Sequence, residues 1–83
     1  MENYVFIARS VTHAQRMQYV LTRGGLHCQV FRAPRELTEL GCAYAVQIPE
    51  RELSAALTAL HAEQLSPIQV FLSQRGFYRE VHI

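Results

Sequence analysis

The sequence predicts a small α+β domain in which strands and helices alternate. Two segments, opening at Ser10 and at Pro49, repeat apolar residues every three or four positions, as amphipathic helices do. Gly or Pro separates most of the segments. The chain of 83 residues suits a single domain over residues 1–83. Short runs rich in β-branched and aromatic residues flank the two helical segments, at 4–8, 26–31, 43–48, 68–72 and 77–81.

The first strand and the first helix are consecutive. Tyr4 to Ala8 predicts the strand, and either Ser10 or Thr12 caps the helix, since Thr12 and Gln15 have the spacing of a capping box. Gly24-Gly25 ends the helix, because Gly accepts the left-handed conformation. The apolar residues of this helix share one face, namely Ala14, Met17, Val20 and Leu21.

A hairpin of two strands follows the first helix. Leu26 to Phe31 predicts the second strand, with Leu26, Cys28 and Val30 on one face, and Pro34 ends it. Arg32 to Gly41 predicts a polar loop. The third strand, Ala43 to Ile48, is almost entirely apolar, which is typical of a central position in a sheet.

The register of this hairpin bears on the two cysteines. If Phe31 pairs with Ala43, Cys28 faces Val46 and lies about 13 Å from Cys42 along the ladder. A disulfide needs Cα atoms within roughly 7 Å. We therefore expect no Cys28–Cys42 bridge, and we interpret Cys28 as core packing.

The second helix opens at Pro49-Glu50-Arg51-Glu52, where Pro suits the first turn and acids suit the helix dipole. Ser66-Pro67 ends this helix, and Ile68 to Leu72 predicts a strand. Gln74-Arg75-Gly76 predicts a turn before Phe77 to Val81, so the last two runs form either a hairpin or one strand with a tail. The apolar stripe of the helix consists of Leu53, Ala56, Leu57 and Leu60.

The resulting order, β-α-β-β-α-β, is the ferredoxin-like pattern. Right-handed crossovers make strands one and two parallel and place strand three antiparallel between them. Both helices then cover one face of a four-stranded sheet, which an extra C-terminal strand can extend. Tyr4, Phe6 and Phe31 share the open face if Val5 and Ile7 point to the helices, and such a face is typical of a homo-oligomer interface.

This topology brings Cys42, at the start of strand three, beside the beginning of the first helix. Helix N-termini attract anions and lower the pKa of a thiol. Such surroundings favour a nucleophilic or persulfide-bearing sulfur, and they equally suit a small bound oxyanion. A buried, inert Cys42 and an ordinary solvated rim are the alternatives. The residues expected at this edge as anion-binding groups are Arg9, Ser10, Thr12, His13, Arg32 and Arg35.

Composition excludes several classes of function. The chain contains no Lys and no Asp, which rules out Schiff-base chemistry, the G-x-x-x-x-G-K phosphate loop and the Ser-His-Asp triad. Two Cys cannot form a four-thiolate zinc site, and no spacing indicates a metal or a cofactor. The net charge of +1 and the lack of a long apolar run predict a cytoplasmic protein that binds neither nucleic acid nor membranes.

Six short motifs together are typical of one known family. They are Tyr4-Val5-Phe6, Ser10-x-Thr12-His13-Ala14, a Leu-x-Cys-x-Val strand, Pro34-Arg35-Glu36-Leu37, Gly41-Cys42 and Gly76-Phe77-Tyr78-Arg79. Through these motifs the sequence resembles the selenium/sulfur carrier-like family of small bacterial proteins. The resemblance covers Tyr4 to about Ile48 and, more loosely, the chain end. Ala43 follows Cys42 where the family pattern has Gly.

The resemblance implies a carrier that holds sulfur or selenium on Cys42 as a persulfide or perselenide. Such a protein passes its cargo from a donor protein to an acceptor protein and is not a full catalyst. The alternative is a small anion-binding or regulatory oligomeric module without covalent chemistry. A third hypothesis is a protein that only mediates contacts, with Cys42 buried.

Overall fold

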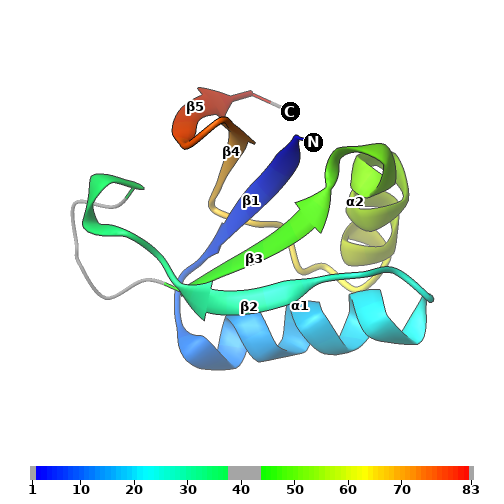
Figure 1. Cartoon of the computed structure of the whole chain (residues 1–83). Coiled ribbons are helices and arrows are strands. Elements are labelled where there is room, and N and C mark those ends of the chain that lie inside the picture. The colour runs from blue at the N-terminus through cyan, green and yellow to red at the C-terminus, as the bar shows by residue number, and fades with distance from the viewer. Residues whose placement is uncertain (1, 38–43, 83) are drawn as a thin grey trace.

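The computed structural model describes residues 2–37 and 44–82. Its elements follow the predicted order, with one further strand at the end (Figure 1). Two single-turn 3-10 helices, η1 and η2, accompany the regular elements. In chain order the elements are β1 (Asn3–Ala8), α1 (Val11–Arg23), β2 (Gln29–Arg32), η1 (Arg35–Leu37), β3 (Tyr44–Pro49), η2 (Glu50–Glu52), α2 (Leu53–Ala62), β4 (Gln69–Gln74) and β5 (Phe77–Val81).

The strands form one open antiparallel sheet in the order β2-β3-β1-β4-β5. β3 lies between β2 and β1 and is antiparallel to both, which makes β1 and β2 parallel and confirms the predicted insertion. Among the described residues β5 pairs with β4 alone, so the last two runs are a hairpin. The sheet formed by residues 2–37 and 44–82 therefore has five strands.

Both helices pack on the same face of this sheet (Figure 1). The predicted stripe of α1 is buried, and α2 contributes Ala56 and Leu60 to the same core. Leu53 and Leu57 are partly buried against it. The apolar periodicity of both helices thus identified the residues that hold the two layers together.

The assignment of the β1 side chains to the two faces was wrong. Phe6 is fully buried on the helix side, with Tyr4 packed against the same core. Val5 and Ile7 lie on the opposite face, together with Phe31. Successive side chains of a strand point to opposite faces, so β1 has two sets of residues, one for each face. Both sets are apolar, so the sequence does not indicate which set faces the helices.

The face opposite the helices is partly covered rather than open. Ala33 precedes η1 and Leu37 is its last residue, and each is only 5% exposed. Both pack on this face against Val5, Ile7 and Ala45. The predicted polar loop from Arg32 to Gly41 therefore contributes apolar anchors before residue 38. A second, smaller core results on this face.

The β2–β3 register differs from the expected one by two residues. Phe31 pairs with Ala45 and Val30 with Val46. A shift of two keeps every side chain on its predicted face, so Leu26, Cys28 and Val30 still pack against the main core. Cys28 is half-buried and free. Cys42 lies outside the described residues, so the absence of a bridge stays a prediction.

Candidate functional site

The candidate site lies at the end of the sheet where β1 stops and α1 begins. Ala8 pairs with Tyr44, and Tyr44 pairs with Arg32, so three strands contribute one cross-strand row here. The predicted nucleophile, Cys42, lies outside the described residues, two positions before Tyr44 in the sequence. The surrounding residues define the chemistry of this end.

Ser10 is the N-cap of α1. Its extended backbone and its Oγ, which accepts a hydrogen bond from the His13 N–H at 3.1 Å, identify it. The His13 side chain also reaches back, since its Nδ1 accepts the backbone N–H of Arg9, the residue before the cap, at 3.2 Å. This differs from a capping box, in which the third helical residue accepts the N–H of the cap residue itself. The N-cap is therefore Ser10, and the expected capping box that begins at Thr12 does not start this helix.

The geometry fixes the tautomer of His13. Because Nδ1 accepts a backbone N–H, the neutral ring carries its proton on Nε2. Burial lowers the pKa of His13, and the charges of Arg9 and Arg16 lower it further. His13 is therefore a neutral hydrogen-bond donor near pH 7 rather than a third cation.

A surface pocket of ≈ 370 Å³ adjoins this cap. It gathers four of the six predicted anion-binding residues, namely Arg9, Ser10, Thr12 and His13. Two guanidinium groups and none of the acidic residues line it among the described positions. The remaining lining residues, which sequence analysis missed, are Arg16, Gln64, Leu65 and Ser66.

The residues that the sequence analysis missed differ in whether a local sequence pattern indicates their position. Arg16 follows Thr12 by four positions, which places both on one helix face, and that spacing was available in the sequence. Gln64 and Ser66 come from the connection after α2. Their position depends on how α2 returns to β4, with Gln64 at a positive φ of 58°, and no local pattern shows it.

Arg32 and Arg35 do not line this pocket. Arg32 is exposed at the end of edge strand β2, at the sheet end that was predicted. Arg35 begins η1, whose last residue, Leu37, packs on the face opposite α1. The structure therefore separates Arg32, at the end of β2, and Arg35, in η1, from the four predicted residues at the helix cap.

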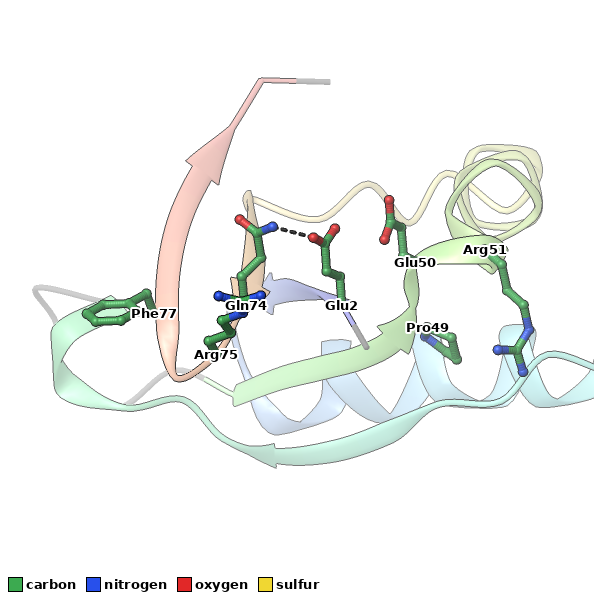
Figure 2. Close-up of a pocket in the computed structure, with 7 residues that line it drawn as sticks. All are labelled: Glu2, Pro49, Glu50, Arg51, Gln74, Arg75 and Phe77. Atoms are coloured by element: carbon green, nitrogen blue, oxygen red, sulfur yellow. Dashed lines mark hydrogen bonds between the residues drawn. The ribbon is translucent and has the colours of Figure 1, made fainter.

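A larger pocket of ≈ 750 Å³ lies at the other end of the sheet (Figure 2). The Glu2 carboxylate accepts a hydrogen bond from the Gln74 amide, and Glu50 lies beside it. The Gln74 bond lowers the pKa of Glu2, whereas the interaction with Glu2 raises the pKa of Glu50. The other lining residues are Pro49, Arg51, Arg75 and Phe77.

Cys28 belongs to this second end, because it precedes Gln29, which pairs with Gln47 near the end of β3. Its Sγ lies 3.6 Å from Thr22 Oγ1 and 3.9 Å from the Gln18 carbonyl oxygen. Its neighbour His27 donates its backbone N–H to Glu52 at 3.0 Å. No basic side chain contacts the thiol through these bonds.

Within residues 2–37 and 44–82, no three His, Cys or Glu side chains gather closely enough to hold a metal ion. In the same part of the chain, no helix has the length and apolar character needed to cross a bilayer.

Fold and site together define a small α+β protein with a cationic, hydroxyl-lined pocket at the start of its first helix. The chain belongs to the family described as "Putative Se/S carrier protein-like", whose model matches residues 3–72. The family resemblance expected from the sequence is thus confirmed. No curated protein and no solved structure matches the chain.

Proposed function

We propose that this protein is a sulfur or selenium carrier that holds its cargo on Cys42, on a ferredoxin-like sandwich extended by β5. Membership of the family carries the proposal. The observed strand order and the position of both helices on one face support the fold assignment.

The position of Tyr44 supports the role of Cys42. Tyr44 lies in the row formed with Ala8 and Arg32, at the end of the sheet where α1 begins. Two peptide units join Cys42 to Tyr44, so covalent geometry alone keeps their Cα atoms within about 7.6 Å. Arg9 follows Ala8 directly, and Arg32 pairs with Tyr44, so both arginines belong to segments that reach this end of the sheet.

The chemistry is a thiol–persulfide exchange. The Cys42 thiolate attacks the terminal sulfur of a donor protein persulfide, forming a new S–S bond as the donor's S–S bond breaks. The donor leaves as a thiolate, Cys42 becomes the persulfide, and an acceptor thiolate repeats the step. The transferred sulfur stays at the sulfane level, and the Cys42 sulfur gains the oxidation level that the donor cysteine sulfur loses, so the exchange needs no external oxidant or reductant. Arg9, Thr12 and the start of α1 would stabilise the anionic forms.

A second candidate function is non-covalent binding of a small anion. The pocket at the α1 cap favours it, because Arg9 and Arg16 face that pocket together with the donors of His13 and Thr12. This function does not need a reactive thiol. It predicts thermal stabilisation by phosphate or sulfate that Arg9→Gln weakens.

Site-resolved alkylation tests the carrier proposal. Iodoacetamide labelling from pH 6 to 9, followed by peptide mass spectrometry, is expected to modify Cys42 well below the ordinary thiol pKa of about 8.5. Cys28 should stay protected. Cys28→Ser is the matched control and should leave the labelling curve of Cys42 unchanged, whereas Cys42→Ser should remove both labelling and loading by a persulfide donor. A Cys42 that titrates like a free thiol and accepts no sulfur would overturn the proposal.

A further inference from the structure

Two surface pockets adjoin along α1, one at its cap and one farther along the helix. A second pocket, of ≈ 360 Å³, shares Thr12, Arg16 and Leu65 with the first. The two therefore adjoin, and we call them together the α1 groove. Its second half is completed by Gln15, Tyr19, Val20 and Glu63.

Helical spacing arranges the side chains of the α1 groove in one row. Thr12, Arg16, Tyr19 and Arg23 follow one another at intervals of four, three and four residues, which places them on one helix face. At 1.5 Å per residue, Thr12 and Tyr19 are separated by roughly 10 Å along the axis. The groove therefore has two ends that one small molecule can reach.

The end near the cap is cationic. Arg9 and Arg16 line it, His13 adds a neutral donor and Ser66 adds a hydroxyl. The nearest acid in the groove, Glu63, belongs to the other half, where it lies 3.6 Å from the Arg23 guanidinium. Arg9 and Arg16 thus face a pocket without acidic lining, which suits a phosphate or sulfate group.

The other end is aromatic. Tyr19 is 64% exposed, and the Arg23 guanidinium lies 5.3 Å from the centre of its ring. Leu65, which is buried, and Val20 supply an apolar floor. Because the guanidinium lies over one face of the Tyr19 ring, a flat ligand would stack on the other face of this largely exposed ring.

We propose that the α1 groove binds a small phosphate ester of a flat heteroaromatic ring, the chemical class of mononucleotides. The phosphate lies against Arg9 and Arg16, and the ring stacks on Tyr19. A phosphate alone would leave Tyr19 exposed, and a ring alone would leave the two guanidiniums without a counterion. This binding goes beyond sulfur or selenium carriage and involves neither cysteine.

Calorimetric titration of the full chain tests the proposal with three probes: adenosine 5′-monophosphate, adenosine and inorganic phosphate. The monophosphate is expected to bind at least about tenfold more tightly than either part, because stacking and charge pairing act together. Arg16→Gln should weaken both the monophosphate and phosphate by about tenfold. Tyr19→Leu should weaken the monophosphate by about tenfold and leave phosphate unchanged.

The matched controls lie on β5, which is the edge strand at the opposite side of the sheet from β2. Phe77→Leu and Arg79→Gln change an aromatic residue and an arginine at exposed positions and should leave all three affinities unchanged. Tyr19→Leu should also leave the alkylation curve of Cys42 unchanged, so failure of this inference is distinguishable from failure of the carrier proposal.

Three results would overturn the inference. One is equal affinity for the monophosphate and inorganic phosphate, and another is a Tyr19→Leu variant that binds the monophosphate normally. The third is a tetra-adenylate that binds at least tenfold more tightly than the monophosphate, which would assign the α1 groove to a nucleic acid strand instead.

Discussion

The two ends of the sheet differ in how their charges are neutralised. At the end where α1 begins, Arg9 and Arg16 face a pocket with no acid among its described lining residues. At the opposite end, Glu2 and Glu50 share a pocket with Arg51 and Arg75. The second pocket is twice as large, yet both charge signs already occur within it. Unbalanced charge, rather than pocket size, therefore marks the end suited to an anion.

The largest effect that we expect concerns the turn between β4 and β5. This turn lies at the end of the sheet where Glu2, Glu50, Arg51 and Arg75 share a pocket, which we call the mixed-charge end. Arg75 and Gly76 have positive φ values of 47° and 84°, as in the turns that connect tightly paired strands. Gly76→Ala should cost about 1–2 kcal/mol of unfolding free energy, because a Cβ disfavours this conformation although it meets no atom within 4 Å. Urea unfolding followed by circular dichroism measures the loss.

Gly24→Ala is the matched control for that turn. Gly24 caps α1 with an ordinary φ of −81°, and an added Cβ would meet only the Leu21 and Val20 carbonyl oxygens, at 3.5 and 3.6 Å. Its unfolding free energy should therefore stay the same or rise slightly. Equal losses in the two variants would show that left-handed backbone at Gly76 is not the cause.

A smaller effect is expected at the cationic end, from loss of the helix cap. Ser10→Ala removes the oxygen that accepts the His13 N–H and should cost about 1 kcal/mol. Thr12→Ala is the control, because Ser10 and not Thr12 is the N-cap, and it should change stability much less. Thermal denaturation of both variants beside the wild type checks this order, and a larger loss in Thr12→Ala would contradict the assigned cap.

The smallest effect belongs to the two carboxyl groups at the mixed-charge end. The pKa of Glu50 is raised from 4.5, so its stabilising contribution is present below pH 4.5 and is lost as the pH rises through the raised pKa. The pKa of Glu2 is lowered, so its contribution is present above pH 4.5 and is lost as the pH falls through the lowered pKa.

Glu50→Gln should consequently raise the Tm slightly at pH 7, where two ionised carboxylates otherwise face each other, and the gain should shrink toward pH 4. Melting curves of Glu50→Gln and of the control Glu80→Gln on β5, recorded at several pH values, test this. A gain that does not depend on pH would argue against repulsion between Glu2 and Glu50.

The sequence predicted the order of the elements well because each element has a distinct local pattern. Three-to-four periodicity identified the buried faces of α1 and α2, and Gly24 marked the end of α1. The insertion of β3 followed from crossover handedness. These inferences depend only on neighbouring residues or on general rules of connection.

Long-range packing explains the errors. Phe6 and Val5 are both apolar, so alternation could not show which one meets the helices. Leu37 lies in a polar segment, but it is buried because the chain folds back over the sheet. The two-residue change in the β2–β3 register has the same origin, since the length of the connecting segment does not fix the pairing.

The candidate site was predicted in part. Arg9, Ser10, Thr12 and His13 adjoin one another in sequence, and the structure places them around one pocket. Arg35 was expected with them but lies in η1, because the conformation of the β2–β3 connection is not encoded locally. The role of Cys42 stays a prediction that alkylation will decide.

The bond from the Arg9 N–H to His13 Nδ1 makes the opening turn of α1 sensitive to acid. A protonated imidazole has no lone pair to accept this bond, so protonation must break it. Since the pKa of His13 is lowered, its contribution to stability is present above about pH 6.5 and fades as the solution becomes more acidic. The same proton would add positive charge beside Arg9 and Arg16. Acidification should therefore fray the first turn of α1 while it strengthens the attraction for anions.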